Sequence, residues 1–412
     1  MDVMKEFFKV TDLQKVLEYR TEFPQVATEE IPLLETVGRI LAEDMVADVD
    51  LPDFPRAIVD GYALQGASTF GASDGNPAYL TVTGSIAMGE SPELTIGPGQ
   101  AVRIATGGML PRGTDSVVMI EHTEAIDDTT IEVYRSVAPG QNLIAIGEDI
   151  KKQTGVLLKG QMIRPQETGL LAALGKQQVA VYQKPVIGII SSGDEIVPIS
   201  ETPSRGQIRD INTYTLSGLI HATGAQATSF GIVRDDFEIL FEKCKLALEQ
   251  CDMILISGGS SVGARDFTVD VLSALRDAKI LVHGISISPG KPTILAKVQN
   301  KAFWGMPGHV ASAMIVFSRV VKPFVEYLSG QTAATQKELR LQAKLSRNVA
   351  ARQGRIDFIR VELRLEEGCL WADPVLGKSG LISTMVKADG LVEIDINTEG
   401  LDKGTEVKVI PL

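Results

Sequence analysis

An apolar run that leads into a glycine-rich turn constrains the fold of this sequence more than any other feature. The run is Met253–Ile256, the turn is Ser257–Gly263, and a segment with a helical pattern follows from Phe267 to Leu275. A strand, a glycine-rich turn and a helix in this order direct backbone N–H groups toward a phosphate at the helix N-terminus. The turn lacks the Gly-Lys-Ser/Thr of a P-loop and does not read GxGxxG. Because such a turn is as often structural as functional, the rest of the chain must decide its role.

The second half of the sequence alternates between strand-like and helix-like segments. After Lys184-Pro185, short apolar runs of strand length are each followed by a segment with a helical pattern. This alternation predicts a doubly wound α/β domain with a mainly parallel sheet. The predicted strands are 186–190, 225–232, 253–257 and 293–297, and the predicted helices are 213–222, 237–248, 267–275 and 311–328.

The remainder of the chain has a different texture. Over Pro52–Gly147, short strand-like runs alternate with Gly, Pro and Asp, which predicts a β-rich unit. Before it, the apolar segment Leu33–Leu41 predicts a short helix. Beyond Gly330, apolar and polar residues alternate, for example over Arg355–Arg364, so a small all-β domain is expected at the end of the chain.

Length and composition limit the class of protein. A chain of 412 residues is expected to hold about two to four domains. The 40 basic and 52 acidic residues give a net charge of −12, which argues against a nucleic-acid-binding face. The three cysteines match no zinc pattern, and Cys244 and Cys251, which bracket a helical segment, are expected to be buried free thiols. An acidic N-terminus and the lack of an apolar run of roughly 18 residues predict neither a signal peptide nor a membrane span, so a cytoplasmic protein is expected.

Polar clusters stand at the ends of the predicted strands. Ligands bind outside the carboxyl ends of the strands in open parallel sheets, so several of these clusters are expected to line one crevice. Gly, Asp and Ser also populate ordinary loops, and it is the joint placement of the clusters that carries the signal. The clusters are 191–195, 234–236, 257–263 with Asp266, 288–292 and 306–309.

The charges in these clusters indicate the chemistry of the crevice. Glu195, Asp235, Asp236 and Asp266 offer hard oxygen ligands for Mg²⁺, and Lys291 offers a cation between a glycine and a proline. Together with backbone N–H groups of the glycine-rich turn, this set suits the breaking or making of a phosphoanhydride. Asp236 has an alternative interpretation as the N-cap of the helix that follows it, which would leave Asp235 as the ligand.

Several motifs occur in order along essentially the whole chain. Each alone would be weak evidence, but the ordered set is highly specific. Together the motifs resemble the molybdopterin molybdenumtransferase family, which comprises the MoeA proteins and the eukaryotic gephyrin E domain. They are Asp60-Gly-Tyr-Ala63, Ala105-Thr-Gly-Gly108, Asp115-Ser-Val-Val-Met-Ile-Glu121, Ser192-Gly-Asp-Glu195, Gly258-Gly-Ser-Ser-Val-Gly263 with Asp266, Pro289-Gly-Lys-Pro292 and Pro307-Gly-His309.

The resemblance implies a multidomain fold of α/β and β regions. A molybdopterin-binding α/β domain similar to MogA and MoaB is expected over 182–330, and a C-terminal β-barrel over 331–412. An inserted β-rich domain is expected over 51–145, between the two parts of an extended linker domain, 1–50 and 146–181. Members of the family are homodimers, so a homodimer with its sites between the subunits is expected.

The resemblance also implies a reaction. The family inserts molybdenum from molybdate into adenylylated molybdopterin, with Mg²⁺, and releases AMP. On that basis Glu195, Asp235 or Asp236, and Asp266 would bind Mg²⁺ or orient the attacking water, and Lys291 would neutralise phosphate or molybdate. The residues expected to bind the substrate are Ser192, Gly193, Gly258, Gly259, Ser260, Ser261, Gly263, Ser288, Pro289, Gly290, Pro307, Gly308 and His309.

Two further residues come from the β-rich region. In relatives the residues at these positions reach the α/β domain of the partner subunit. Asp60 would therefore complete the acidic set from the opposite subunit, and Thr106 would donate its hydroxyl group there. Each also has a structural alternative, Asp60 as a turn residue before Gly61 and Thr106 as a local cap.

The sequence departs from the family pattern near the expected site. Some members carry lysine where this chain has Ser288, and proline is usual where this chain has Val310. These departures leave open a tungstate-specific paralogue and a non-catalytic molybdopterin-binding carrier or scaffold. A molybdopterin adenylyltransferase is an expected partner, whereas nucleic acid and membrane are not.

Overall fold

The chain divides into two compact units. The computed structural model describes residues 10–258, 264–332 and 338–412, and the side chains of 264–266 lie outside that description. The first unit comprises Met1–Glu43, Lys159–Thr168 and Gln178–Leu412, and the second comprises Asp44–Leu158 and Gly169–Gln177. Within the described residues, no helix combines the length and the apolar character that a bilayer crossing requires.

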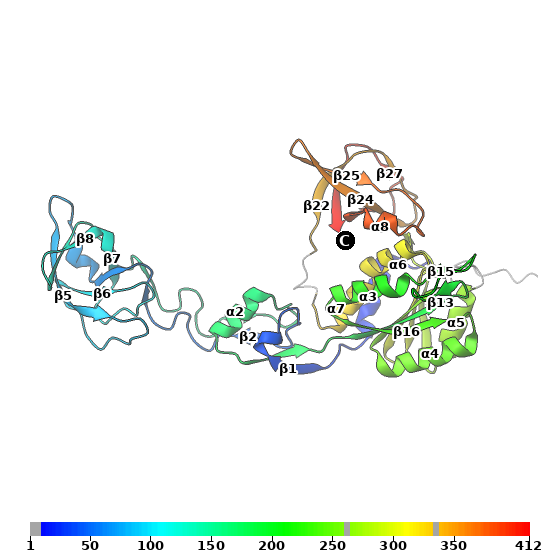
Figure 1. Cartoon of the computed structure of the whole chain (residues 1–412), viewed down its shortest axis with the longest axis horizontal. Helices are drawn as coiled ribbons and strands as arrows, with labels where there is room; N and C mark the ends of the chain where they lie inside the picture. The colour runs from blue at the N-terminus through cyan, green and yellow to red at the C-terminus, as the bar shows by residue number, and fades with distance from the viewer. Residues whose placement is uncertain (1–9, 259–263, 333–337) are drawn as a thin grey trace, which may run out of the picture. The chain divides into compact units, whose positions relative to one another are not determined.

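A six-stranded sheet forms the centre of the first unit (Figure 1), with the strand order β16-β13-β17-β21-β20-β18. The first four strands are parallel, whereas β20 runs antiparallel to both of its neighbours. The prediction of a doubly wound, mainly parallel α/β domain is therefore confirmed. The strands are β13 (Val186–Ser192), β16 (Gln226–Val233), β17 (Met253–Gly258), β18 (Ala278–His283), β20 (Ile294–Val298) and β21 (Lys301–Met306).

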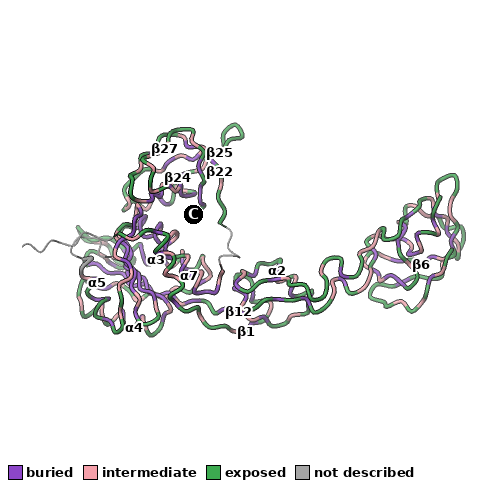
Figure 2. The backbone as a smooth tube through the Cα atoms, turned by 180° about the vertical axis from the view of Figure 1, so that it is seen from behind, coloured by how far each residue is buried: buried purple, intermediate pink, exposed green. Residues whose placement is uncertain are grey.

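Helices cover both faces of this sheet, and the buried strands lie between them (Figure 2). The apolar run has become β17, whose side chains alternate between two hydrophobic cores. Met253 and Leu255 face the core that α3 and α6 share, and Ile254 and Ile256 face the core that α4 and α5 share. A strand buried on both faces has to be apolar throughout, which explains the run. The helices are α3 (Asn212–Ala222), α4 (Phe237–Gln250), α5 (Ala264–Ala274), α6 (Val310–Val316) and α7 (Lys322–Leu328), with a π-helical segment at Phe317–Val321.

The hairpin β20–β21 was not predicted. The sequence indicated one strand near this position, followed directly by the last helix, but the chain turns at Gln299 (φ +55°) and pairs Lys301–Met306 back onto β20. Because β20 is antiparallel, its first residues lie at the edge where the parallel strands end. The segment 288–292, which precedes β20, therefore arrives at that same edge.

Five strands close into a barrel in the C-terminal region, as predicted. They pair in the order β24-β25-β22-β28-β26, and β26 pairs back onto β24. A short sixth strand, β19, extends the barrel from the α/β region by pairing with the start of β24. The strands are β19 (Ile287–Ser288), β22 (Leu341–Leu345), β24 (Ile356–Glu366), β25 (Cys369–Pro374), β26 (Gly390–Ile394) and β28 (Glu406–Pro411), with the bridge pair β23 (Val349–Ala350) and β27 (Gly400–Leu401) and the short helix α8 (Ser383–Val386).

The barrel and the α/β region share a hydrophobic core. Ile356, Phe358, Met385 and Leu391 of the barrel belong to the same buried cluster as Trp304 of β21. Burying this apolar surface between the two regions holds them together within one unit.

The predicted helix over Leu33–Leu41 is wrong. A 3₁₀ turn covers Leu33–Glu35, after which Gly38 takes φ +80°. The Gly38 N–H donates to the carbonyl of Ile163 (2.8 Å), and the Leu41 N–H donates to that of Gln161 (2.9 Å). The backbone groups of this segment thus pair with a distant part of the chain, which an isolated helix would not allow. The first unit also contains α1 (Leu13–Glu18) and the antiparallel pair β1 (Thr28–Pro32) and β12 (Gln178–Tyr182).

The second unit contains the predicted β-rich region. Its six-stranded sheet has the order β7-β4-β6-β5-β9-β8, in which β5 and β6 are the one parallel pair. The strands are β4 (Gly61–Leu64), β5 (Ala78–Ile86), β6 (Gln100–Ile104), β7 (Ser116–Met119), β8 (Thr123–Ala125) and β9 (Thr130–Val133). Short antiparallel pairs, β2 (Met45–Val46) with β11 (Gly155–Leu157) and β3 (Arg56–Ala57) with β10 (Leu143–Ile144), lie on either side of it in the sequence, and α2 (Pro165–Ala173) follows.

Candidate functional site

The carboxyl ends of the parallel strands lie in register at one edge of the α/β sheet. Ser192 at the end of β13 is paired with Val233 of β16 on one side and with Gly258 of β17 on the other. Ser257 is in turn paired with Met306 of β21. The residues at 192–195, 234–236, 258 and 307–309 therefore leave the sheet at the same edge.

Two glycines at this edge are required by the backbone. Gly258 has φ +141°, and a Cβ atom there would lie 1.8 Å from the Ser192 carbonyl oxygen. Gly193 has φ +154°, and its Cβ would lie 2.8 Å from the Glu195 carboxylate. Both conformations disfavour residues with a side chain, and the first is blocked outright by the neighbouring strand. Gly258 thus has a structural role whether or not it also contacts a ligand.

Buried polar side chains at the start of α3 link the carboxyl ends of the strands. The Asn212 amide at the start of α3 donates to Ser257 Oγ (2.7 Å) and to the Gly308 carbonyl (2.8 Å). Thr213 Oγ1 lies 3.0 Å from Ser191 Oγ, and the Thr213 N–H donates to the Asp210 carboxylate (3.1 Å). These side chains hold the end of β17 and the turn after β21 at a fixed separation. The sequence prediction missed Asn212, because its partners are 45 and 96 residues away.

The two neighbouring aspartates after β16 have different roles. Asp236 is the N-cap of α4, where its carboxylate accepts the N–H of Ile239 (3.0 Å). Asp235 instead accepts the Ser192 hydroxyl (2.8 Å), which directs its carboxylate toward the end of β13. The alternative that assigns Asp236 to the helix cap and Asp235 to the crevice is therefore the one that the geometry favours. Glu195, on the same edge, is exposed.

The glycine-rich turn itself lies outside the described residues. That applies to Gly259, Ser260, Ser261 and Gly263, and likewise to the side chain of Asp266, although α5 begins at Ala264. Among the side chains that the structure describes, no group of three or more Asp, Glu, His or Cys residues is arranged to hold a metal.

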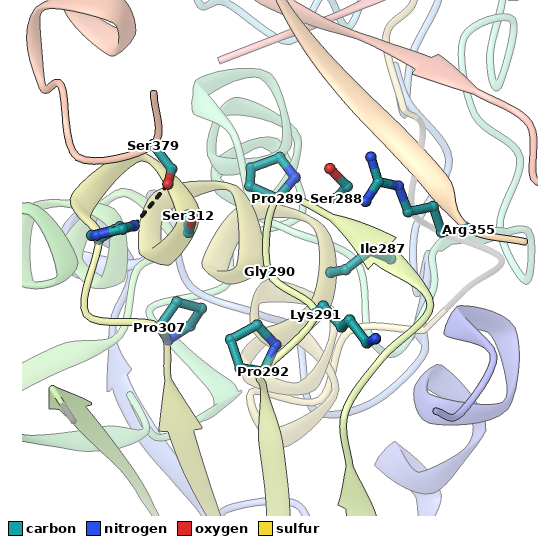
Figure 3. A pocket seen from close by; sticks show the side chains of 11 residues that line it. Ile287, Ser288, Pro289, Gly290, Lys291, Pro292, Pro307, Ser312, Arg355 and Ser379 are labelled. Carbon is teal, nitrogen blue, oxygen red and sulfur yellow. Dashed lines mark hydrogen bonds between the residues drawn. The ribbon is translucent and has the colours of Figure 1, made fainter. Parts of the chain in front are cut away.

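A pocket of about 270 Å³ lies at the same edge, where the segment 288–292 meets the turn after β21 (Figure 3). The expected residues Ser288, Pro289, Gly290, Lys291, Pro307 and His309 all line it. Three polar lining residues were not predicted, namely Ser312 from α6 and Arg355 and Ser379 from the barrel region. Figure 3 shows Arg355 beside Ser288 on one side of the pocket and Ser312 and Ser379 on the other.

The charge and hydrogen-bonding groups of the pocket suit an anion. Arg355 pairs through Nη2 with the buried Asp357 (3.1 Å), and its buried Nε–H has no acceptor among the described residues. The Arg355 side chain lines the pocket and brings a positive charge to it. Lys291 adds a second positive charge, and Ser288, Ser312 and Ser379 add hydroxyl donors.

The barrel contributes directly to this pocket. The Ser379 carbonyl accepts the N–H of Ala311 (3.0 Å), and Ser379 Oγ lies 2.8 Å from His309 Nδ1. On the other side, the Ile356 N–H donates to the Ser286 carbonyl (2.8 Å), next to the pairing of β19 with β24. Arg355 and Ser379 are therefore held against the α/β region, although they are far from it in the sequence.

Asp60 and Thr106 lie in the second unit, where they bind each other. The Thr106 N–H and hydroxyl both donate to Asp60 Oδ1, at 2.7 and 2.9 Å. These hydrogen bonds, with a smaller contribution from the charge of Arg103, lower the pKa of the Asp60 carboxyl. Asp60 is therefore kept ionised, and Thr106 is the residue that holds it.

Comparisons with known proteins agree with the resemblance seen in the sequence. Three family models match in order: the MoeA N-terminal region (domain I and II) over 9–175, a "probable molybdopterin binding domain" over 188–327, and the MoeA C-terminal region (domain IV) over 342–412. A molybdopterin biosynthesis protein of Methanocaldococcus jannaschii is 37% identical over 405 residues, which cover 96% of this chain and 94% of that protein.

Two further relatives extend the match. The molybdopterin molybdenumtransferase of Haemophilus influenzae is 34% identical over 401 residues, 96% of each chain. The crystal structure of the molybdopterin biosynthesis protein moeA of Pyrococcus horikoshii covers 98% of this chain and 100% of that chain, with 32% identity and a TM-score of 0.84. The sequence similarity covers both units, and the chain belongs to the MoeA family.

Proposed function

We propose that this protein is a molybdopterin molybdenumtransferase that acts in molybdenum cofactor biosynthesis. Relatives in Haemophilus influenzae and Bacillus subtilis, 34% and 32% identical, carry that name. The observation that carries the proposal is the pocket at the sheet edge, which combines Arg355, Lys291 and three serine hydroxyls. The carrier or scaffold alternative is less favoured, because a scaffold has no need of a pocket lined by two cationic side chains and three hydroxyl groups.

The pocket is proposed to bind the oxyanion substrate. Molybdate is a tetrahedral dianion, so it needs positive charge and hydrogen-bond donors from several directions. Arg355 and Lys291 offer positive charge, and the serines offer hydroxyl groups on two sides. Arg355 lies beside Ser288, the position at which some relatives have lysine. Tungstate has the same charge and shape, so the oxyanion is decided by experiment.

The carboxylates at the edge of the α/β sheet form what we call the acidic edge. This acidic edge is proposed to assist cleavage of the phosphoanhydride of adenylylated molybdopterin, with release of AMP. Asp235, Glu195 and Asp266 are the residues proposed to hold Mg²⁺. The exposed carboxylates of Asp235 and Glu195 fit this ion, which binds through one or two carboxylates together with substrate phosphates. Bound there, the ion would neutralise charge on the phosphates. The Ser192 hydroxyl fixes the Asp235 carboxylate, and the backbone N–H groups after Gly258 are proposed to bind the pterin phosphate.

A homodimer is proposed to complete the site. Asp60 and Thr106 of one subunit would add a carboxylate and a hydroxyl to the acidic edge of the other. The ionised state of Asp60 supports this role, since a charged carboxylate can take part in a metal or phosphate site. An exposed apolar surface supports the dimer, because Leu34 is 93% and Val37 is 54% exposed in the described chain.

The test is oxyanion-dependent AMP release. The purified protein is incubated with adenylylated molybdopterin, Mg²⁺ and either molybdate or tungstate. We expect release with molybdate, abolished in Asp235→Asn and requiring at least about tenfold more molybdate in Arg355→Met, since charge-assisted hydrogen bonds are lost. Arg276→Met, an exposed arginine, is the matched control and should behave as wild type. Tight pterin binding without AMP release for either oxyanion would overturn the catalytic proposal.

A further inference from the structure

A loop of the barrel, 376–381, reaches the pocket through Ser379. Two hydrogen bonds link the loop to the α/β region. The Ala311 N–H donates to the Ser379 carbonyl (3.0 Å), and Ser379 Oγ lies 2.8 Å from His309 Nδ1. The loop contains no regular secondary structure beyond turns, and the Leu381 N–H closes one of them on the Lys378 carbonyl (3.1 Å). A further side chain holds the two ends of the loop.

Arg360 on β24 holds both ends of this loop. At the start of the loop, its Nη2 donates to the Gly377 carbonyl (2.7 Å). At the end, its Nη1 donates to Thr384 Oγ1, and that hydroxyl donates onward to the Leu381 carbonyl (2.6 Å). One guanidinium group therefore spans the loop from Gly377 to Leu381, with Ser379 at the centre of the span.

The remaining contacts of Arg360 support this assignment. No carboxylate in the described chain forms an ion pair with Arg360, and burial lowers the pKa of its guanidinium. Arg360 is half-buried, and its hydrogen bonds go to the Gly377 carbonyl and the Thr384 hydroxyl at the two ends of the loop. Arg364, four residues further along the same strand, pairs instead with Asp373 and Glu366 at the surface.

We propose that Arg360 is a positioning residue, which fixes loop 376–381 so that the Ser379 hydroxyl faces the oxyanion in the pocket. This inference rests on the proposed function of the pocket. A planar guanidinium with two donor edges can bridge the two ends of the loop, whereas a lysine ammonium can reach one of them at a time. The side chain acts through Ser379 and need not touch the substrate.

The first test measures molybdate binding by calorimetry in the full-length chain. Arg360→Met and Ser379→Ala are each expected to weaken binding by about tenfold, the worth of one charge-assisted or well-placed hydrogen bond. The double variant should bind no more weakly than the weaker single variant, because both changes remove the same contact. Arg364→Met is the matched control and should bind as wild type does. Wild-type affinity in Arg360→Met, or losses that multiply in the double variant, would overturn the proposal.

Arg360→Lys is a second variant that tests the role of Arg360, and ¹⁵N NMR provides a second measurement. Arg360→Lys retains the charge but loses one of the two bonds, and an intermediate loss of affinity is expected. If Arg360→Met does not fold, wild-type affinity in Arg360→Lys is the overturning result.

The second measurement is the ¹⁵N NMR spectrum of the four histidines, in which His309 is assigned with His309→Gln. Release of the loop in the Arg360 variants should shift the His309 Nδ1 resonance without any molybdate present. If wild-type protein binds no molybdate, the proposed function of the pocket fails, and an unchanged Nδ1 resonance separately overturns the role of Arg360.

Discussion

Removing the amide of Asn212 should destabilise the α/β region strongly. Its two hydrogen bonds are short; the one to Ser257 Oγ is buried, and the one to the Gly308 carbonyl is partly buried. Each contributes a net of about 1 kcal/mol, and leaving the carbonyl without a donor costs about 1–3 kcal/mol more. Asn212→Ala should therefore lower the free energy of unfolding by about 3–5 kcal/mol. Asn212→Leu, with nearly the same shape but no donors, should lose a similar amount and so separates hydrogen bonding from packing.

The assay is urea unfolding followed by tryptophan fluorescence. The chain has two tryptophans, and Trp304 is fully buried in the α/β core, so a Trp371→Phe background reports on that region. Asn300→Ala, in the exposed hairpin turn, is the control and should change the free energy of unfolding by less than about 0.5 kcal/mol. A loss in Asn212→Ala below about 1 kcal/mol would refute the reasoning that this residue ties the strand ends together.

Three other predictions concern ionisation, thiol reactivity and assembly. Because the hydrogen bonds of Thr106 lower the pKa of Asp60, their contribution to stability should be complete above the ordinary aspartate pKa of about 3.9 and lost as the pH falls below it. Thr106→Val should raise the pKa of Asp60 that ¹³C NMR measures, and an unchanged pKa would contradict the assignment. Burial raises the pKa of the Cys244 thiol to about 12. A thiol reagent at pH 8 should therefore modify the exposed Cys369 quickly and Cys244 only after unfolding, which mass spectrometry would detect. Rapid labelling of Cys244 in the folded chain would contradict this prediction. Leu34→Glu should convert the proposed dimer to monomer in light scattering, and a monomeric wild-type chain would count against the dimer itself.

The central strand could be predicted because its environment leaves a strong pattern. Met253–Ile256 is apolar at every position, as a strand buried on both faces has to be. The strand β21 leaves a weaker pattern, because Lys301–Met306 includes alanine and glycine, which have little preference for strands. Gly305 is explained by the neighbouring strand, since its Cβ would lie 3.1 Å from that of Ile294. That constraint exists once the hairpin is formed and is not visible in the sequence.

Part of the candidate site could likewise be predicted from the sequence, and part could not. Asp235, Lys291 and the segment 307–309 follow or precede strands of one sheet, so the rule for parallel sheets brings them together. Arg355 and Ser379 come from the barrel, and their place in the pocket depends on the pairing of β19 with β24 and on the Ser379 contacts. No periodicity within the barrel sequence encodes that docking. Tertiary contacts of this kind had to be seen in the structure.

The hydrophobic core that the barrel shares with the α/β region has a consequence for synthesis of the chain. The α/β helices end at Leu328, but Phe358, Met385 and Leu391 complete the same core. At about 5–20 residues per second, the ribosome needs on the order of 3–13 s to extend the chain from Leu328 to Leu391. During that time the nascent α/β region carries an uncovered apolar surface. A chain interrupted near Leu328 is therefore expected to need a chaperone to stay in solution, and the barrel relieves that need when it docks.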